Sequence, residues 1–389
     1  MEKILILGAG LVARPLIRHL LGKGYRLTVA DILQHKAAEL IENHPNAVAI
    51  ALNVHDESAL GECIEQHDLV VSLLPYMFHV QVARLCVALR RNMVTTSYVK
   101  PEMEALDIPA KEAGIVILNE MGLDPGIDHM SAMRVIDHIH ARGGKVEEFY
   151  SVCGALPAPE AATNPFRYKF SWSPKGVVMA GNNDARFLKN GGEVLVPTAQ
   201  LFRNPLTINF SSVGNLDIYP NRDSISYISI YGIPEVKNMM RGTFRFPGWC
   251  EIMDALKRLN LISYDKIDLT DLTFAQLVAR QIGAENEGNI KAMVAGYLSV
   301  PEDSVAIQAM EWLGLFENKP MLRNVDSAFE VTSDLMIDKM QLETFERDMV
   351  VMQHTFVAAY ANGSKEVIRS RMLDYGSPAT DTSIARTVA

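Results

Sequence analysis

Short apolar runs alternate with amphipathic stretches through the first 120 residues of the chain. Residues 4–7 form one such run and lead into a glycine-rich turn, which is followed by a helical pattern from about Leu11 to Leu21 and by a second run at 26–30. Further runs lie at 47–52, 68–74, 93–96 and 115–118, with helical stretches such as 80–90 and 102–113 between them. This alternation predicts an α/β fold with a doubly wound parallel sheet, a Rossmann domain, over residues 1–125.

The pattern changes after the glycine pair at 143–144, where extended segments begin to predominate; they lie at 146–153, 206–209 and 225–231. Four helical stretches with apolar residues at three- and four-residue spacing follow, at 248–259, 274–282, 287–297 and 304–313. Two extended runs, 349–360 and 365–373, then flank Asn362-Gly363, a strong hairpin signal. We therefore expect a second, sheet-based domain over 126–245 and 330–375, with a helical insertion over 246–329.

Composition and charge narrow the class of protein. The chain has 389 residues, 48% of them hydrophobic, and a formal net charge of −9, which argues against nucleic acid as a partner. No apolar run reaches the length of about 18 residues that spans a bilayer, and Met1 leads directly into a core strand, so we expect no membrane partner, no signal peptide and a cytoplasmic protein. Four cysteines without a C-x-x-C pair and ten histidines without an H-E-x-x-H motif predict neither a disulfide framework nor a bound metal.

The turn Gly8-Ala9-Gly10-Leu11-Val12-Ala13 has the spacing G-x-G-x-x-A and directly follows an apolar run. In this pattern the first glycine permits a tight turn, the second lets the backbone approach a pyrophosphate, and the small last residue lets the helix pack on the strand. The helix then directs its first N–H groups at the phosphates. The turn therefore predicts a dinucleotide cofactor bound at Gly8, Gly10, Leu11 and Val12.

Asp31 ends the second apolar run about 20 residues after the turn, where this fingerprint places an acidic residue. A carboxylate there accepts hydrogen bonds from the ribose hydroxyls of NAD but repels the 2′-phosphate of NADP, by about 3 kcal/mol per unit charge at ~5 Å and an effective dielectric of ~20. We therefore expect NAD to be preferred. NADP is the alternative, with Lys36 as the nearby cation that could bind the phosphate, and an aspartate that merely ends a strand is the structural alternative.

The segment 119–129, N-E-M-G-L-D-P-G-I-D-H, holds two glycines, a proline and four ionisable groups just after an apolar run. Such a density at the carboxyl end of a predicted strand indicates a binding site. Asp124 precedes a proline and is directed toward extended backbone; we interpret it as a functional carboxylate, with a turn-forming role as the alternative. Asp128 is placed to cap the helix that follows.

Two clusters of the second domain suit the wall of a pocket. Residues 151–159 end a predicted strand in a proline-rich loop, and residues 168–174, Y-K-F-S-W-S-P, alternate aromatic and hydroxyl side chains. Cys153 in the first cluster fits a small buried hydrophobe better than a nucleophile. Trp172 in the second cluster could equally belong to the core.

Arginines form the third cluster. Arg222 lies in the turn 219–224 and could bind a carboxylate in bidentate geometry, although an exposed arginine in a turn is usually only solvated. Arg241 and Arg245 supply two more guanidinium groups nearby in the sequence. Together they favour an anion site more than any one of them does alone.

These clusters resemble the saccharopine reductases, the glutamate-forming saccharopine dehydrogenases of lysine metabolism, over nearly the whole chain. The glycine-rich turn is generic, whereas four motifs in this order are specific: L-D-P-G-I-D-H at 123–129, C-G-x-L-P-A-P-E at 153–160, Y-K-F-S-W-S at 168–173 and P-N-R-D-S at 220–224. Two shorter signatures are S-L-L-P-Y at 72–76 and T-T-S-Y-V at 95–99.

The resemblance implies a Rossmann domain, a mixed α/β substrate domain with a helical insertion, and a segment over 376–389 that begins to return to the Rossmann domain. It also implies a homodimer and a reversible hydride transfer at the secondary amine of saccharopine, which is thereby interconverted with L-glutamate and α-aminoadipate semialdehyde. Saccharopine carries several carboxylates, for which arginines are suitable partners. Family members that use NADP carry a basic residue near the position of Asp31, so the acid here indicates an NAD-preferring branch.

Site residues follow from the same resemblance. Those implied to contact the cofactor are Gly8, Gly10, Leu11, Val12, Asp31, Asn53, Val54, Leu74, Leu123, Asp124, Pro125 and Ser173. Those implied to contact the substrate are Ser97, Tyr98, Asp124, Arg222, Thr243, Phe244 and Arg245. Reduction and hydrolysis of an imine need a proton near nitrogen and a base, and Asp124, Tyr98 and Cys153 are the catalytic groups that we place nearest.

Two other functions compete with this interpretation. A carboxynorspermidine dehydrogenase-like enzyme also reduces an imine on a similar scaffold, but it needs acids to hold a cationic polyamine, whereas the arginines here favour carboxylates. A non-catalytic nucleotide-sensing protein could keep the Rossmann fold without turnover. The polar clusters of the second domain argue against it.

Overall fold

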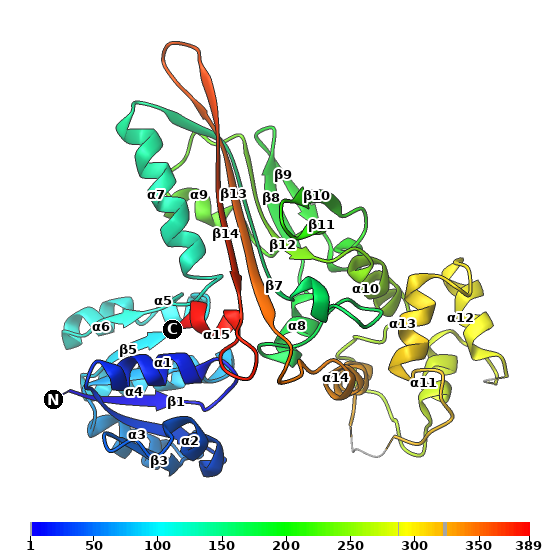
Figure 1. Cartoon of the computed structure of the whole chain (residues 1–389), viewed down its shortest axis with the longest axis horizontal. Helices are drawn as coiled ribbons and strands as arrows, with labels where there is room; N and C mark the ends of the chain where they lie inside the picture. The colour runs from blue at the N-terminus through cyan, green and yellow to red at the C-terminus, as the bar shows by residue number, and fades with distance from the viewer. Residues whose placement is uncertain (1, 287, 322–324) are drawn as a thin grey trace. The chain divides into compact units, whose positions relative to one another are not determined.

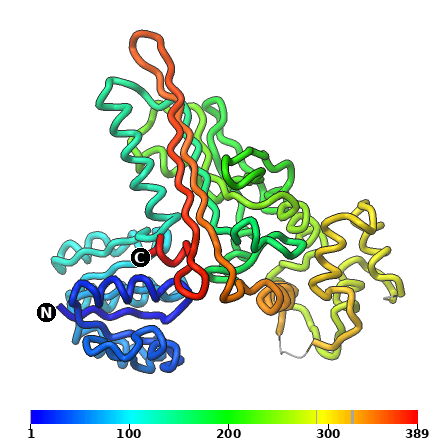
Figure 2. Tube along the Cα trace, viewed as in Figure 1, coloured from blue at the N-terminus to red at the C-terminus, as the bar shows by residue number. Residues whose placement is uncertain are grey.

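The computed structural model describes residues 2–286, 288–321 and 325–389, and its chain divides into two compact units (Figures 1 and 2). Unit 1 contains the residues up to Ser131 together with Gly376–Ala389, and unit 2 contains Ala132–Tyr375. Both chain ends therefore belong to unit 1.

Unit 1 is built on a six-stranded parallel sheet with the strand order β3-β2-β1-β4-β5-β6. This is the strand order of a Rossmann domain, so the predicted doubly wound α/β fold is confirmed. The strands are β1 (Lys3–Leu7), β2 (Arg26–Asp31), β3 (Ala47–Ala51), β4 (Leu69–Ser72), β5 (Asn92–Thr95) and β6 (Ile117–Leu118). The helices of its first 131 residues are α1 (Ala13–Gly22), α2 (Gln34–Ile41), α3 (Glu57–Glu65), α4 (His79–Leu89), α5 (Pro101–Glu104), α6 (Asp107–Ala113) and the start of α7 (Ile127–Ala141).

The central strand β1 is buried on both faces. Ile4 and Ile6 pack into one hydrophobic core and Leu5 and Leu7 into another, because successive side chains of a strand point to opposite faces of the sheet. An apolar run without polar alternation is what a central parallel strand requires. This is why the sequence pattern located the sheet.

The stretch 102–113, which we predicted as one helix, forms the two short helices α5 and α6 instead. Pro109 lies in the first turn of α6, where a proline is tolerated. Because proline has no N–H, it cannot bond to the carbonyl four residues earlier, at Ala105. A continuous helix would lose that bond, and the chain breaks there.

The segment 376–389 belongs to unit 1, and its helix α15 (Ser383–Val388) packs against α1. Ile384 and Ala385 are buried. Arg18 of α1 lies 3.5 Å from Asp381, which precedes α15. Both apolar and charged contacts therefore join the end of the chain to the first helix.

Unit 2 is built on a mixed sheet with the path β10-β11-β12-β7-β13-β14, to which β8 and β9 are added beside β12. The central pair β7 and β12 is parallel, and the other pairs are antiparallel, so the predicted mixed α/β domain is confirmed. The strands are β7 (Lys145–Pro157), β8 (Ala185–Lys189), β9 (Gly192–Val196), β10 (Leu206–Phe210), β11 (Gly214–Pro220), β12 (Asn238–Arg245), β13 (Asp348–Ala359) and β14 (Lys365–Tyr375).

The hairpin predicted at Asn362-Gly363 is confirmed. It joins β13 to β14, which remain paired over their whole length and form the long arm visible in Figures 1 and 2. Gly363 has a φ of +82°, in the left-handed region that such a turn requires.

Our prediction that a strand ends near Cys153 is wrong, because β7 continues to Pro157. Cys153 is paired on both sides, with Thr243 of β12 and Met352 of β13. Only at Pro157 does a residue without an N–H donor end the strand. Cys153 is therefore an interior residue of a central strand.

The prediction of an extended segment at 225–231 is also wrong: Ser226–Ile230 form the short helix α9. Its β-branched residues favour strands, but the buried side chains are Tyr227 and Tyr231, four residues apart. Their rings lie 5.6 Å from each other. Side chains four apart share a face of a helix and not of a strand, so packing decided the structure.

The four predicted helices of the insertion are confirmed as α10 (Trp249–Arg258), α11 (Phe274–Gln281), α12 (Ile290–Leu298) and α13 (Val305–Leu313). Glu287, which we placed at the start of the third, lies outside the described residues; α12 begins after Asn289, whose side chain accepts a hydrogen bond from the Ala292 N–H. The remaining α-helices of unit 2, among the described residues, are the rest of α7 from Ala132 onward, α8 (Pro174–Ala180), α9 and α14 (Ala328–Lys339). None of the described helices is long and apolar enough to cross a membrane.

Candidate functional site

The glycine-rich turn of unit 1 has the geometry of a phosphate-binding loop. Gly8 has a φ of +101°, and a Cβ there would lie 3.1 Å from the Leu73 carbonyl oxygen. Gly10 is different, because a Cβ there would meet no protein atom within 4 Å. The backbone at Gly10 therefore borders space that a ligand can enter.

Helix α1 starts directly after this turn, at Ala13, which is fully buried against the sheet. Within the part of the chain that the structure describes, no side chain caps the start of α1. An uncapped helix start presents backbone N–H donors and the positive end of the helix dipole, which together suit a phosphate.

Asp31 is the last residue of β2, and its carboxylate is held by two backbone donors. Oδ2 accepts a hydrogen bond from the Ala9 N–H at 2.9 Å, and Oδ1 accepts one from the Leu33 N–H at 2.9 Å. The carboxylate thus lies beside the phosphate turn in a fixed orientation. An open backbone at Gly10, an uncapped helix and this carboxylate fit an adenine dinucleotide.

The other implied cofactor residues of unit 1 follow strand ends. Asn53 and Val54 come after β3, and Leu74 comes after β4. Asn53 folds its loop by accepting a hydrogen bond from the His55 N–H at 3.1 Å, and the Val54 carbonyl accepts one from the Gln81 side chain at 2.9 Å. All three residues lie where open parallel sheets bind ligands.

The loops after β5 and β6 are joined through side chains. The Tyr98 hydroxyl donates a hydrogen bond to Asp124 Oδ1 at 2.8 Å. Glu120 Oε1 accepts one from the Val99 N–H at 3.0 Å, and its other oxygen lies 2.8 Å from His129 Nε2. The resemblance implied that Tyr98 and Asp124 belong to one site, and in the structure the two side chains are in direct contact.

Asp124 is followed by a cis peptide bond to Pro125 in a tight loop, with Leu123 and Pro125 buried beside it. Our prediction that Asp128 caps the next helix needs correction, since α7 begins at Ile127 and Asp128 lies in its first turn. Its Oδ1 accepts a hydrogen bond from the Gly126 N–H at 2.7 Å. The carboxylate supports the loop from inside the helix.

A buried histidine that the sequence analysis missed lies behind this edge of the sheet. His79 begins α4, and its Nδ1 lies 2.9 Å from the Ser72 hydroxyl. Its Nε2 lies 2.9 Å from the Ser97 hydroxyl and 3.1 Å from that of Thr95. Burial lowers the pKa of His79 to about 4. The serine of S-L-L-P-Y, which ends β4, and the serine of T-T-S-Y-V, two residues after the end of β5, were the available signals.

In unit 2, Arg245 lies in an aromatic cage. The centre of its guanidinium is 5.0 Å from the Tyr168 ring, 5.3 Å from the Trp249 ring and 6.0 Å from the Tyr219 ring. Only 4% of the residue is exposed. Burial raises the pKa of Tyr168 and of Tyr219, so both phenols stay neutral.

The guanidinium of Arg245 has a donor available for a ligand. Its Nη1 donates to the Phe244 carbonyl at 2.8 Å, while its Nε has no hydrogen-bond partner among the described residues. The indole N–H of Trp249 is likewise buried and unpartnered within the described residues. Buried donors without partners are costly in a folded protein and point to a missing acceptor.

The other two arginines differ in exposure. Arg241 is 3% exposed, with its guanidinium 4.4 Å from the Tyr227 ring. Arg222 is exposed in a turn with a φ of +50°, and its carbonyl accepts a hydrogen bond from the Arg186 N–H at 2.8 Å. The Asn221 N–H donates to the Arg241 carbonyl at 2.9 Å, which ties this turn to β12.

The other implied residues of unit 2 differ in exposure. Phe244 is fully buried, and its carbonyl already accepts a hydrogen bond from Arg245, whereas the neighbouring Thr243 is partly exposed. Ser173 caps α8 by accepting a hydrogen bond from the Gly176 N–H at 3.3 Å. Cys153 is 5% exposed.

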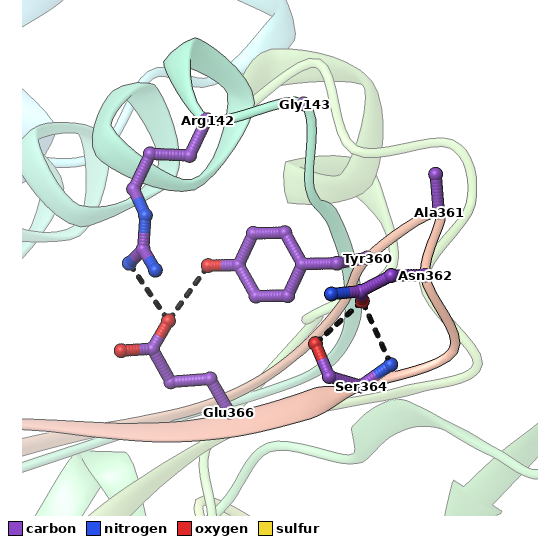
Figure 3. Close-up of a pocket in the computed structure, with 7 residues that line it drawn as sticks. All are labelled: Arg142, Gly143, Tyr360, Ala361, Asn362, Ser364 and Glu366. Atoms are coloured by element: carbon purple, nitrogen blue, oxygen red, sulfur yellow. Dashed lines mark hydrogen bonds and ion pairs between the residues drawn. The ribbon is translucent and has the colours of Figure 1, made fainter.

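An open hollow near the tip of the β13–β14 hairpin, drawn in Figure 3, contains none of these residues. Glu366, one of the residues that line it, accepts a hydrogen bond from Tyr360 at 2.7 Å and pairs with Arg142 at 2.8 Å. Its charged groups therefore bind one another, and we assign it no ligand.

Comparison with known families gives a consistent result along the whole chain. Residues 4–118 match the model of the saccharopine dehydrogenase NADP binding domain, and residues 122–389 match that of the saccharopine dehydrogenase C-terminal domain. The chain belongs to the saccharopine dehydrogenase family. Its first domain binds a pyridine nucleotide.

Relatives of this saccharopine dehydrogenase family member span its full length. It is 37% identical over 393 residues to a saccharopine dehydrogenase (NADP+, L-glutamate-forming) of Pyricularia oryzae, with 97% of this chain and 85% of that protein covered. It is 34% identical over 396 residues to the mitochondrial alpha-aminoadipic semialdehyde synthase of Bos taurus, covering 100% of this chain but 42% of that protein.

A solved relative shares the fold. The apo histidine-tagged saccharopine dehydrogenase (L-Glu forming) of Saccharomyces cerevisiae superposes with a TM-score of 0.87 at 34% identity, covering 100% of this chain and 88% of that chain. The Rossmann sheet and the mixed sheet described above are therefore those of the saccharopine dehydrogenase family.

Proposed function

We propose that this chain catalyses the reversible, pyridine-nucleotide-dependent interconversion of saccharopine with L-glutamate and α-aminoadipate semialdehyde, a step of lysine metabolism. The observation that carries the proposal is the match to both domains of the saccharopine dehydrogenase family, together with relatives of this activity along the full length. The chemistry of the described residues supports it.

The arginines of unit 2 suit the acidic substrate. Arg245 holds a desolvated guanidinium with a free Nε, and a carboxylate is the ligand that such a group binds best. Arg222 supplies a second guanidinium from an exposed turn. We assign both to substrate carboxylates, with Thr243 and Phe244 beside Arg245 on β12.

Asp124 and Tyr98 are the acid–base candidates. In the oxidative direction the amine carbon loses a hydride and the nitrogen loses a proton, and water then adds to the imine so that the carbon–nitrogen bond breaks. A bound nicotinamide would supply the acceptor for that hydride. The Asp124 carboxylate, with Tyr98 donating to it at 2.8 Å, is suited to take the proton from nitrogen or from the attacking water.

Cys153 and Ser97 have different proposed roles in this reaction. Cys153 was a third catalytic candidate, and its burial inside a central strand supports only a role in lining the site. Ser97 is half-buried at the end of β5, next to Tyr98, and suits contact with the substrate.

For the cofactor we propose a preference for NAD over NADP. The Asp31 carboxylate is fixed by two backbone donors and faces the position of the ribose in a Rossmann domain. The relatives, by contrast, carry NADP+ in their names. A single residue can account for such a difference, because a carboxylate and a 2′-phosphate repel each other.

The proposal is tested by mixing the purified chain with saccharopine and either NAD or NADP, and by following the absorbance of reduced nicotinamide while glutamate release is measured. Turnover with stoichiometric glutamate supports the proposed reaction, and the ratio of the two cofactors measures the preference. Nicotinamide binding without turnover of saccharopine contradicts the proposed reaction. It would favour a polyamine-type imine as the substrate, or a nucleotide-sensing role.

Two further expectations accompany this function. We propose a homodimer, which light scattering of the purified chain tests directly. We also retain the expectation of a cytoplasmic protein, which fractionation of the source cells tests.

A further inference from the structure

Three hydroxyl groups from the ends of two strands of unit 1 meet at one side chain. Ser72 is the last residue of β4, Thr95 is the last of β5, and Ser97 follows two residues later. The hydroxyls of all three lie within 3.1 Å of a ring nitrogen of His79. His79 is 3% exposed, and Ser72 is fully buried.

In its neutral form the imidazole has one donor nitrogen and one acceptor nitrogen, so a hydroxyl on one side accepts from the ring and a hydroxyl on the other side donates to it. Burial keeps the ring neutral, since it lowers the pKa of His79 to about 4. The hydroxyl orientations of Ser72 and Ser97 are therefore coupled through one ring. A protonated histidine would have two donors and no acceptor.

The bonds of His79 continue into the loops that carry the acid–base candidates. The Ser97 carbonyl accepts a hydrogen bond from the Glu120 N–H at 3.2 Å, and the Thr95 carbonyl accepts one from the Met121 N–H at 3.1 Å. Tyr98, the next residue after Ser97, bonds to Asp124. One imidazole thus supports both loops from behind.

We propose that His79 is a positioning residue for the reaction: its imidazole fixes the Ser97 hydroxyl and the adjoining Tyr98 loop in the orientation that the substrate requires. This inference rests on the proposed function, in which Ser97 and Tyr98 meet the substrate. It assigns no proton transfer to His79.

A second buried histidine of the same unit provides a matched control. His67 is 6% exposed and also bridges two groups, with Nδ1 2.7 Å from the Cys63 carbonyl oxygen and Nε2 2.7 Å from the Thr28 hydroxyl. It precedes β4, at the edge of the sheet opposite to the ligand-binding strand ends. Its loss should affect folding but not the site.

The experiment compares His79→Leu, His79→Gln and His67→Gln by melting temperature, by NAD affinity and by kcat and KM for saccharopine. We expect His79→Leu to lower kcat/KM for saccharopine by about tenfold to a hundredfold, because small displacements of reacting groups have effects of that size. NAD affinity should stay within about twofold of the unmodified chain. His79→Gln, which restores a donor and an acceptor, should recover part of the loss.

A double variant of His79 and Ser97 distinguishes a positioning role of His79 from a general loss of stability. Ser97→Ala combined with His79→Gln should lose no more activity than the worse of the two single variants, because residues that act through one interaction are not additive. His67→Gln should lower the melting temperature while its kcat and KM stay within about twofold of the unmodified chain.

Two outcomes overturn the proposal. Kinetic constants of His79→Leu that equal those of the unmodified chain, or losses that multiply in the Ser97→Ala double variant, show that His79 is only structural. Should His79→Leu fail to fold, His79→Gln and the double variant decide the question. Absence of saccharopine turnover by the unmodified chain overturns the proposed function and this inference with it, whereas normal turnover with unaffected variants overturns the inference alone.

Discussion

The Tyr98 hydroxyl donates a 2.8 Å hydrogen bond to Oδ1 of Asp124. The two residues follow β5 and β6, which are neighbouring parallel strands, so their loops emerge at the same edge of the sheet. A phenol that donates to a carboxylate oxygen fixes the orientation of that carboxylate. The pair therefore presents one oriented carboxylate with a second proton donor beside it.

Replacing either member should reduce the chemistry. We expect Asp124→Ala to lower kcat/KM for saccharopine by about a hundredfold or more, and Tyr98→Phe by about tenfold or more, which is the usual range for acid–base groups. Steady-state kinetics with saturating cofactor measures both effects. Tyr25→Phe, a change at a partly buried tyrosine of the Rossmann core, is the control. Losses below about tenfold for both site variants contradict the assignment of this pair.

The Asp31 carboxylate should control cofactor choice. Asp31→Asn keeps the size and one acceptor but removes the charge, so the repulsion of about 3 kcal/mol toward a 2′-phosphate disappears. We expect the ratio of kcat/KM for NADP to that for NAD to rise by up to about a hundredfold. Asp56→Asn, at the cap of α3, removes one charge elsewhere in the same unit and should leave the ratio unchanged. If the NADP-to-NAD ratio of kcat/KM is unchanged in Asp31→Asn, the proposed role of Asp31 in NAD preference is contradicted.

Gly10 offers a test of where the cofactor lies. A Cβ at this position meets no protein atom within 4 Å, so Gly10→Ala should leave the melting temperature of the free chain unchanged. If a pyrophosphate lies against the backbone, the added methyl group should weaken cofactor binding by at least about tenfold, or about 1.4 kcal/mol. Gly22→Ala also adds a methyl group in open space and should leave binding unchanged. Equal cofactor affinity in both variants, measured by calorimetry, would place the phosphates elsewhere.

Local patterns predicted the framework of this molecule well. The apolar runs located the parallel strands because those strands are buried on both faces, as Ile4 and Leu5 show by packing into opposite cores. Turn chemistry located the phosphate loop and the hairpin, since Gly8 and Gly363 both have positive φ. Each of these signals depends on a few adjacent residues.

Local patterns failed where distant residues decide the structure. The 225–231 segment is helical because Tyr227 and Tyr231 pack together, although its isoleucines favour a strand. The contact of His79 with Ser97 joins residues 18 apart that meet only through the order of β4 and β5. The spacing of residues in the sequence does not predict such a contact.

The candidate site shows the same division. Asp124 was predicted from the density of polar residues around it, but its partner Tyr98 lies 26 residues away. The cage of Arg245 takes its three rings from separate segments, at Tyr168, Tyr219 and Trp249. The sequence indicated an arginine near the substrate, and only the structure shows that it is desolvated.

Acid should remove a stabilising charge cluster at Glu147. This carboxylate lies 2.5 Å from Lys365 and 2.9 Å from Lys237, and their hydrogen bonds lower its pKa to about 2, from 4.5. Because the folded-state pKa is depressed, the stabilisation is fully present above about pH 4.5 and is lost as the pH falls toward 2. We expect Glu147→Gln to lower the melting temperature slightly at pH 7 and to match the unmodified chain near pH 2, since exposed pairs contribute little. A difference that persists at pH 2 contradicts this origin.

Arg245 should lower the stability of the ligand-free chain and strengthen substrate binding. The residue is 4% exposed, and its Nε has no hydrogen-bond partner among the described residues. Burying this charge therefore destabilises the ligand-free chain, and a bound carboxylate would offset that destabilisation. Arg245→Met fills similar volume without the charge. We expect this variant to melt at a temperature equal to or above that of the unmodified chain.

The same substitution should nearly abolish substrate binding. Losing one member of a buried charge pair costs about 2–5 kcal/mol, so the affinity for saccharopine should fall at least about thirtyfold. Arg245→Lys should lie between, because an ammonium group keeps the charge but cannot bind a carboxylate through two parallel donors. Arg203→Gln, an exposed pair partner of Asp254 in the same unit, should behave as the unmodified chain. Thermal shifts with saturating NAD, with and without saccharopine, measure both quantities. If Arg245→Met melts lower and is still stabilised by saccharopine, the cage holds Arg245 for the fold and not for the substrate.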